Sequence, residues 1–282
     1  MVENRPWLTF MTYAVLILGI LVICFPIYIT FVASTHTLPE INSAPMPWLP
    51  GDQFFENYKT ALTAGSSAGG TVPVSTMLLN SMVMALGIAL GKIAISLLAA
   101  FAIVYFDFRF RMGFFWLIFI TLMLPVEVRI LPTYEVIADL GMLNSYPGLI
   151  IPLIASATAT FFFRQFFLTV PEELAEAARI DGAGPFRFFI DIVFPMARTS
   201  IAALFVILFI YGWNQYLWPL LITTDKSFYT ILIGINQMIA VFDNMQEWHI
   251  IMATTLLAML PPVLVVVCMQ RLFVKGIIET EK

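Results

Sequence analysis

The sequence contains few charged residues. Only 11% of its 282 residues are Asp, Glu, Lys or Arg, whereas 60% are hydrophobic. This composition and a mean hydropathy of +0.92 exclude a soluble globular core and predict a polytopic membrane protein surrounded by lipid. The net charge of -4, without a clustered basic motif, argues against nucleic acid as a partner.

Cysteine and catalytic motifs are also scarce. Cys24 and Cys268 lie in separate apolar runs, so we expect small buried thiols rather than a disulfide framework or a metal site. The segment GIALGKI (87–93) has the glycines and lysine of a phosphate loop, but it lacks their spacing and the Ser or Thr after lysine. No HExxH, GxSxG or CxxC motif occurs. We therefore expect no enzymatic activity and no cofactor bound by this chain.

Apolar runs long enough to cross a bilayer recur along the chain. An all-α membrane protein with six transmembrane helices is predicted, with spans at about 13–33, 77–105, 114–130, 146–168, 201–223 and 249–273. Residues 13–273 form the membrane domain, between tails at 1–12 and 274–282. The Pro- and Gly-rich stretch 36–71 is predicted to be an extramembrane loop. Within span two, Gly87 with Gly91 and Ala85 with Ala89 favour close helix approach.

Basic residues predict the orientation. Six spans place most of them on one side: Arg5, Arg109, Arg111, Arg164, Arg179, Arg187, Arg198, Arg271, Lys275 and Lys282. The loops on the other side contain only Lys59 and Lys226. Because the positive side is cytoplasmic, both termini are expected inside and the 36–71 loop outside.

A polar segment at 171–195 separates two apolar runs. Thr169 and Glu172 suggest a capping box, and Gly182 suits a helix stop. A second helix restarts at Pro185 with an apolar stripe of Phe186, Phe189, Ile190 and Val193, and ends at Pro195. The segment predicts a helix, a glycine hinge and a second helix. It suits either docking into a groove of another protein or lying on the membrane surface.

One motif in this segment is specific. EAARIDGAGPFRFFIDIVFP (176–195) resembles the signature loop of permease subunits of binding-protein-dependent ABC importers, with Phe194 where leucine is usual. FFRQFF (162–167), GWNQYLWPLLITTD (212–225) and PPVLVVVCMQRLFVKG (261–276) are similar to the carbohydrate-importer branch. MVENRPWLTF (1–10) and LPVEVRILPTYEVIADLGMLNSYPGL (124–149) resemble the second permease subunits of the subfamily that imports sn-glycerol-3-phosphate.

The resemblance implies a type I ABC importer permease fold and a division of labour. The expected partners are a second related permease chain, two copies of an ATPase subunit, which use ATP and magnesium, and an extracytoplasmic substrate-binding protein. In the family, the loop (169–199 here) seats in a cleft of the ATPase. The coupling residues are then Glu176, Ala177, Ala178, Asp181, Gly182 and Ala183.

A phosphate-bearing cargo needs cationic groups along its path through the bilayer. Arg129, expected at the outer end of span three, and Lys92, within span two, are the candidates. Arg129 could instead pair with Glu127 or Glu135 to order a re-entrant segment between Pro125 and Pro132. Lys92 could instead extend its ammonium group towards water, or neutralise a charged residue of the second permease chain.

Span five supplies further candidates for the path: Trp213, Asn214 and Tyr216. On a continuous helix Asn214 and Trp218 would share one face, and Tyr211 and Gln215 another. The aromatic residues could equally form an interfacial belt.

Two other functions remain open. The cargo could be a different sugar or polyol. An ion-coupled secondary transporter is the alternative of another class; it would need acidic or histidine relays inside the spans, and no Asp or Glu is expected at mid-span in spans two to six.

Overall fold

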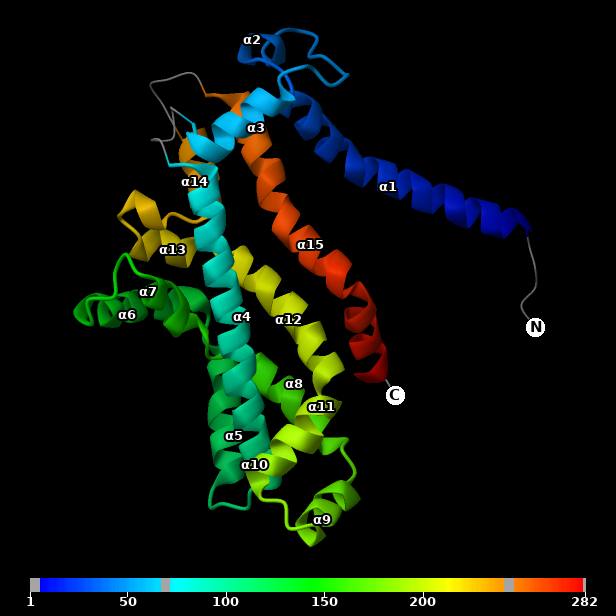
Figure 1. Ribbon diagram of the computed structural model, residues 1–282, viewed down its shortest axis with the longest axis vertical. Coiled ribbons are helices and arrows are strands. Elements are labelled where there is room, and N and C mark those ends of the chain that lie inside the picture. Colours follow the sequence, from blue (N-terminus) through cyan, green and yellow to red (C-terminus); the bar gives the residue numbers. More distant parts are fainter. Residues whose placement is uncertain (1–5, 67–71, 241–245, 281–282) are drawn as a thin grey trace. The chain divides into compact units, whose positions relative to one another are not determined.

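The computed structural model describes residues 6–66, 72–240 and 246–280, and every regular element in these ranges is helical (Figure 1). The chain divides into two compact units. Unit 1 comprises Met1–Ser75 and Gly234–Met259, and unit 2 comprises Thr76–Ile233 and Leu260–Lys282.

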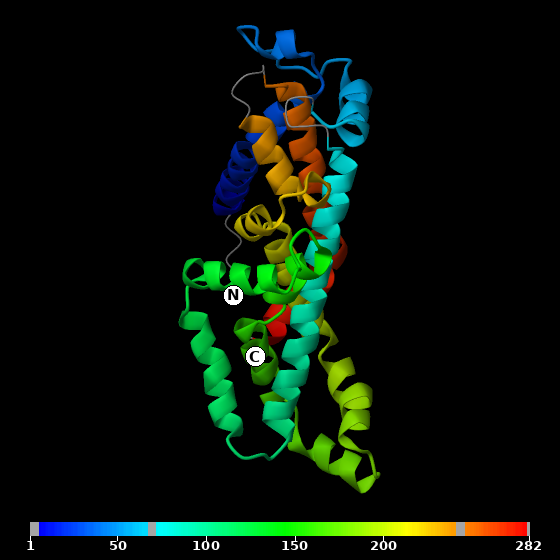
Figure 2. The same cartoon turned by 90° about the vertical axis from the view of Figure 1, so that its left-hand side faces the viewer.

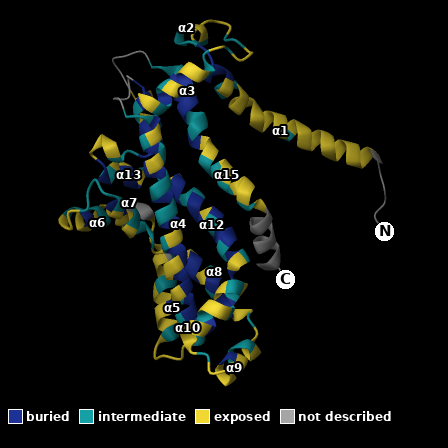
Figure 3. Ribbon diagram, viewed as in Figure 1, coloured by how far each residue is buried: buried dark blue, intermediate teal, exposed yellow. Residues whose placement is uncertain are grey.

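Three helices of the described ranges are long and apolar enough to cross a membrane. They are α1 (Pro6–Ser34), α4 (Val74–Tyr105) and α15 (Trp248–Thr280). They confirm three of the predicted spans as long apolar helices. Burial differs sharply between them, since 6% of the apolar window of α1 is buried but 50% of that of α4 (Figure 3).

Two further candidate spans are bent. The first joins α7 (Tyr146–Ile150) and η2 (Ile151–Leu153) to α8 (Ala157–Leu168) at 51°. In the second, the helical segment Pro185–Met196 meets α12 (Arg198–Trp213) at 72°. The described residues therefore contain three candidate spans, or five if each bent pair counts once, and a total of six stays a prediction.

The predicted third span, 114–130, is wrong as one continuous helix. The chain forms α5 (Arg111–Ile120), a 3-10 turn η1 (Thr121–Met123) and then α6 (Val126–Asp139). Pro125, with φ -56° and ψ 146°, lies in an extended conformation that ends the first segment and starts the second. Figures 1 and 2 show α6 lying across the direction of α4.

Unit 2 is built on a core where α6, α7 and α13 (Leu217–Ile222) meet α4. Its buried residues are Met84, Ile88, Ile130, Ile137, Leu149, Trp218 and Ile222. The predicted close approach of helices through glycine is confirmed. A Cβ on Gly87 would lie 2.6 Å from Ile150 Cδ1, and one on Gly91 would lie 2.5 Å from Ile154 Cγ2.

The polar stretch after α1 is more ordered than the sequence predicts. It contains α2 (Leu38–Ile41) and α3 (Phe54–Thr63). The Asn57 side chain donates to Ser34 O at 3.0 Å and to His36 O at 2.9 Å, which ties α3 to the end of α1. These buried hydrogen bonds compensate for the low apolar content of the stretch.

The two thiols are not buried as predicted. Cys24 on α1 and Cys268 on α15 are both exposed, because the described part of the chain does not cover the helix faces on which they lie. The remaining described elements are α9 (Glu172–Ile180), α10 (Pro185–Phe188), η3 (Phe189–Val193), α11 (Phe194–Met196), η4 (Lys226–Phe228) and α14 (Ile231–Ile239).

Candidate coupling hairpin and transmembrane cations

The polar segment forms the predicted helix, hinge and helix. Helix α9 (Glu172–Ile180) ends at Asp181, whose N–H donates to Ala177 O at 2.9 Å. Gly182 then adopts φ +74°, a left-handed conformation that favours glycine, and Ala183 N–H donates to Ala178 O at 2.8 Å. Helix α10 (Pro185–Phe188) follows. We call the segment from Glu172 to Met196 the hairpin.

The start of α9 differs from the sequence prediction. The Thr169 hydroxyl donates to Phe166 O at 2.7 Å, so it belongs to the end of α8. Pro171 occupies the N-cap position of α9 and provides no side-chain cap. The predicted capping box between Thr169 and Glu172 is therefore wrong.

The second half of the hairpin does not end at Pro195. A π-helical turn, η3 (Phe189–Val193), leads into α11 (Phe194–Met196), which contains this proline. Pro195 has no N–H to donate, and the π-helical bond from Phe194 N to Phe189 O shifts the backbone ladder just before it. The helix therefore continues to Met196.

The shifted ladder also changes which side chains are buried. Phe186 is 74% exposed, whereas Phe188 is 7% exposed, so the predicted apolar stripe is wrong at its first residue. Ile190 is exposed as well, and Val193 is buried as predicted.

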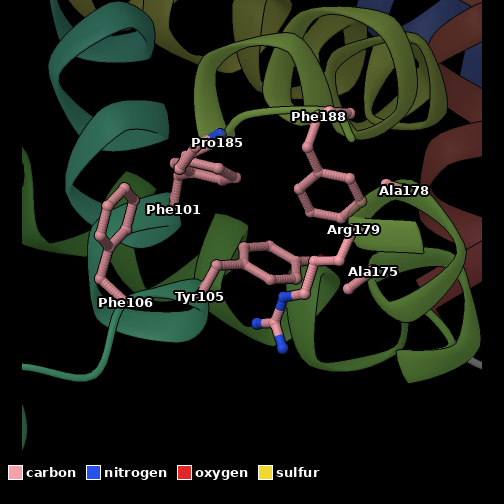
Figure 4. Close-up of a pocket in the computed structure, with 9 residues that line it drawn as sticks. Phe101, Tyr105, Phe106, Ala175, Ala178, Arg179, Pro185 and Phe188 are labelled. Atoms are coloured by element: carbon pink, nitrogen blue, oxygen red, sulfur yellow. The ribbon is translucent and has the colours of Figure 1, made fainter. Parts of the chain in front are cut away.

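The base of the hairpin packs on the end of α4. The Phe188 ring meets the Tyr105 ring edge-on, with 5.1 Å between the ring centroids. The centroids of the Phe189 and Phe101 rings lie 4.9 Å apart. A cavity of about 130 Å³ remains between these rings and α9 (Figure 4). Its lining residues from α9 include Ala178, which is 5% exposed.

The six predicted coupling residues fall into two groups. Glu176, Ala177, Asp181 and Gly182 are exposed, while Ala178 is buried and Ala183 is half-buried. Ala178 is buried on the side of α9 that faces the end of α4, and the four exposed residues form a surface that another protein can contact.

Two residues of this surface were missed from the sequence. Ile180, 87% exposed, and Phe186, 74% exposed, stand on either side of Gly182. The signal for Ile180 is a large apolar residue directly before the predicted hinge, whereas the sequence assigns Phe186 to the apolar stripe of the second helix.

Basic side chains gather at the hairpin end of unit 2. Those described are Arg109, Arg111, Arg164, Arg179, Arg187 and Arg198. A groove of about 470 Å³ between the ends of α4, α8 and α9 is lined by Arg111, Arg179, Asp107, Glu172 and Glu176, among others. Arg111 pairs with Asp107 at 3.6 Å, and Arg187 with Asp191 at 3.3 Å. The predicted basic residues Arg5, Arg271, Lys275 and Lys282 lie outside the described side chains.

Lys92 and Arg129 are brought together. Lys92 is 7% exposed, and its Nζ lies 3.7 Å from the centroid of the Tyr211 ring on α12. The Arg129 guanidinium is near enough for its charge to repel the Lys92 ammonium. Arg129 was expected at the outer end of a span, but its neighbour Ile130 belongs to the buried core that includes Ile88, near the middle of α4. The break before α6 causes this difference in depth.

The alternative role of Arg129 was an ion pair with Glu127 or Glu135. Glu135 does not form an ion pair with Arg129 in the described part of the chain. The Glu127 side chain lies outside the described residues.

Span five is interrupted where the other candidates lie. Helix α12 ends at Trp213, which is 3% exposed and stacks on Phe209 at 5.9 Å. Asn214 is exposed at the break, and Tyr216 is half-buried before α13. Within the described residues, no hydrogen bond, ion pair or ring contact joins these three residues to Lys92 or Arg129.

The break also corrects the predicted helix faces. Trp218 belongs to the next helix and donates from its indole Nε1 to Gly148 O at 3.2 Å, so it shares no helical face with Asn214. Gln215 does lie on the Tyr211 side, since its Nε2 donates to Tyr211 O at 3.2 Å.

Comparison with known proteins decides the family. Residues 92–279 match the family described as "Binding-protein-dependent transport system inner membrane component". The chain belongs to this family. Binding-protein-dependent permeases of this kind are non-catalytic membrane subunits of ABC importers, and ATP hydrolysis takes place on a separate chain. They work with a partner permease, an ATPase and a binding protein.

Several curated relatives of this permease are similar over the whole length of both chains. The sn-glycerol-3-phosphate transport system permease protein UgpE is 60% identical in Agrobacterium fabrum, 59% in Brucella melitensis and 58% in Rhizobium meliloti, in each case over 282 residues. Among solved structures, a bacterial ABC transporter involved in the import of the acidic polysaccharide alginate matches with a TM-score of 0.81. That match covers 96% of this chain and 99% of the other at 20% identity, which shows a shared fold.

Proposed function

We propose that the chain is a permease subunit of an ATP-driven importer of sn-glycerol-3-phosphate. The observation that carries this proposal is the 58 to 60% identity, over all 282 residues, to permeases named for that solute. A different sugar or polyol is the competing cargo. Ion-coupled secondary transport is set aside because the family works with a separate ATPase.

The hairpin binds the ATPase and transmits the conformational change of the ATPase to this subunit. Its tip exposes Glu176, Asp181 and the apolar Ile180 and Phe186, while Ala178 fixes its base on α4. Exposed apolar groups rimmed by polar ones are typical of protein interfaces. Closure of two ATPase subunits, driven by ATP and magnesium bound on those subunits, would therefore move α9 and, through Phe188, the end of α4.

The orientation of the subunit follows from the same end of unit 2. Arg179 and Arg187 belong to the hairpin, and Arg109 and Arg111 follow the end of α4 on which it packs, which favours a cytoplasmic position for it under the positive-inside rule. Both termini are then cytoplasmic, and a binding protein delivers cargo on the opposite side. A second, related permease chain completes the translocation path, to which Trp213, Asn214 and Tyr216 remain candidates at the break after α12.

The deciding experiment is uptake by the complete transporter, with both permeases and two ATPase copies in proteoliposomes and the binding protein outside. We expect ATP-dependent accumulation of radiolabelled sn-glycerol-3-phosphate, and none when the ATPase is inactivated. Accumulation of glycerol or a disaccharide in its place would overturn the cargo assignment while leaving the importer class intact. Accumulation driven by an ion gradient without ATP would overturn the importer class.

A further inference from the structure

Lys92 on α4 contacts the Tyr211 ring on α12, and Arg129 on α6 precedes Ile130, which belongs to the same buried core as Ile88, one helical turn before Lys92. Lys92 is eighteen residues after the start of a 32-residue helix (92 - 74 = 18), so it lies close to the centre of that helix. Arg129 is not at the end of a full-length span, because the chain breaks before α6 and Ile130 joins the buried core that includes Ile88.

Two cations in this position form an unusual arrangement. Lys92 is buried within this chain and Arg129 is exposed at its surface, and an unpaired charge inside a membrane is costly. Among the described side chains, no carboxylate forms an ion pair with either residue. The Tyr211 ring face, 3.7 Å from Lys92 Nζ, attracts the ammonium but does not neutralise it.

We propose that Lys92 and Arg129 together bind the phosphoryl group of the cargo as it passes the middle of the membrane, with Tyr211 positioning the lysine. This inference rests on the proposed function. A phosphate monoester has a charge between about -1.5 and -2 at pH 7, so it balances two cations with little charge left over. The planar guanidinium of Arg129 donates two parallel hydrogen bonds to phosphate oxygens, and the Lys92 ammonium has three N–H donors.

The cation pair also gives the path its selectivity. A phosphate ester neutralises both cations, whereas glycerol or a neutral sugar leaves both unpaired and the Lys92 ammonium buried without a counter-charge. Discrimination against neutral solutes thus arises from charge left uncompensated in the empty or wrongly filled site, beyond any selection made by the binding protein.

The test uses the complete transporter in proteoliposomes and measures KM and the maximal rate of sn-glycerol-3-phosphate uptake. Lys92→Gln and Arg129→Gln should each raise KM by about 10- to 100-fold, the loss expected for a charge-assisted hydrogen bond. Lys92→Arg should retain a KM near that of the wild type. Tyr211→Phe keeps the ring face and should transport normally, while Tyr211→Leu should raise KM. Lys59→Gln, which removes an exposed cation from α3, is the matched control.

The outcomes separate the inference from the proposed function. Wild-type uptake of sn-glycerol-3-phosphate tests the cargo, whereas the variants test the site. If the wild type transports the ester and Lys92→Gln and Arg129→Gln leave KM unchanged, the phosphoryl site is wrong. If they lower only the thermal stability of the complex and leave KM unchanged, a carboxylate of the partner permease neutralises the cations, and the inference is equally overturned.

Discussion

Two breaks in the helical chain differ in their surroundings and in their chemistry. At the hairpin tip, the break is an exposed glycine, Gly182, with φ +74° and no heavy atom within 4 Å of an added Cβ. Between α5 and α6, the break is a 3-10 turn followed by Pro125, among apolar residues. Water can solvate the free backbone groups at the first break, whereas backbone groups inside a membrane need partners within the protein.

The second break meets this requirement locally. Leu124 N–H donates to Thr121 O at 3.4 Å, Val128 N–H donates to Pro125 O at 3.2 Å, and Pro125 itself has no donor to satisfy. The hairpin break is hydrogen-bonded as well, with Gly182 N–H donating to Arg179 O at 3.1 Å and Ala183 N–H to Ala178 O at 2.8 Å, so the two breaks differ in their surroundings rather than in their bonding. The polar break at the hairpin tip is open to contact with another protein, whereas the apolar break before α6 sets the position of Arg129 relative to α4.

The largest effect is expected at the exposed break. Gly182→Val places a β-branched residue at a positive φ, which is strongly disfavoured, so the hairpin tip must rearrange. We expect uptake by the complete transporter to be abolished while the amount of protein inserted in the membrane stays normal. Gly184→Val is the matched control, because Gly184 has φ -70° and ψ 166°, which valine adopts readily. Equal uptake by the two variants would refute the role of the hinge.

An intermediate effect is expected at the surface beside the hinge. Ile180→Ser and Phe186→Ser together remove two exposed apolar side chains, so the folded permease loses little packing. The double variant should weaken retention of the ATPase by about 10-fold or more, as for hot-spot residues. Co-purification with the ATPase and a melting curve of the permease measure the two quantities. A lower melting temperature with unchanged ATPase retention would show that these residues stabilise the permease itself.

The smallest effect is expected where helices meet close to the second break. Gly91→Ala puts a Cβ 2.5 Å from Ile154 Cγ2 and 3.0 Å from Ile154 Cβ, near the stiff base of that side chain. Overpacking of this kind costs about 1–3 kcal/mol. Gly87→Ala meets the far end of Ile150, which can turn aside, and should cost less. Melting temperatures in detergent should rank wild type above Gly87→Ala and Gly91→Ala lowest; the reverse order of the variants would contradict the packing described.

The sequence predicted the hairpin well because its signals are local. Glycine and proline act on their own backbone, so a hinge at Gly182 and a restart at Pro185 could be placed without tertiary information. The π-helical turn before Pro195 could not, because the expected stripe assumes bonds between residues four apart. Its consequence, the burial of Phe188 in place of Phe186, was missed for the same reason.

The residues of the cation site could be predicted from the sequence, but their position relative to one another could not. Lys92 and Arg129 stood out as charges in or beside apolar runs, but hydropathy counted 114–130 as one span and placed Arg129 at its outer end. The depth of Arg129 depends on Pro125 ending the first segment and on Ile130 packing against α4, which is a tertiary contact. The ring of Tyr211 beside Lys92 likewise depends on how α12 packs and has no signal in local sequence.

The shortness of α5 affects how this segment is accommodated in the membrane. Ten residues at about 1.5 Å each give a helix of roughly 15 Å, half of a hydrocarbon layer about 30 Å thick. By length alone, this helix does not cross the layer. Its aromatic face meets α8 instead, with Phe119 lying 5.7 Å from Phe161. A helix this short makes its apolar contacts with α8 rather than along a full hydrocarbon layer, so the third apolar segment depends on its neighbour in the fold and not on its own length.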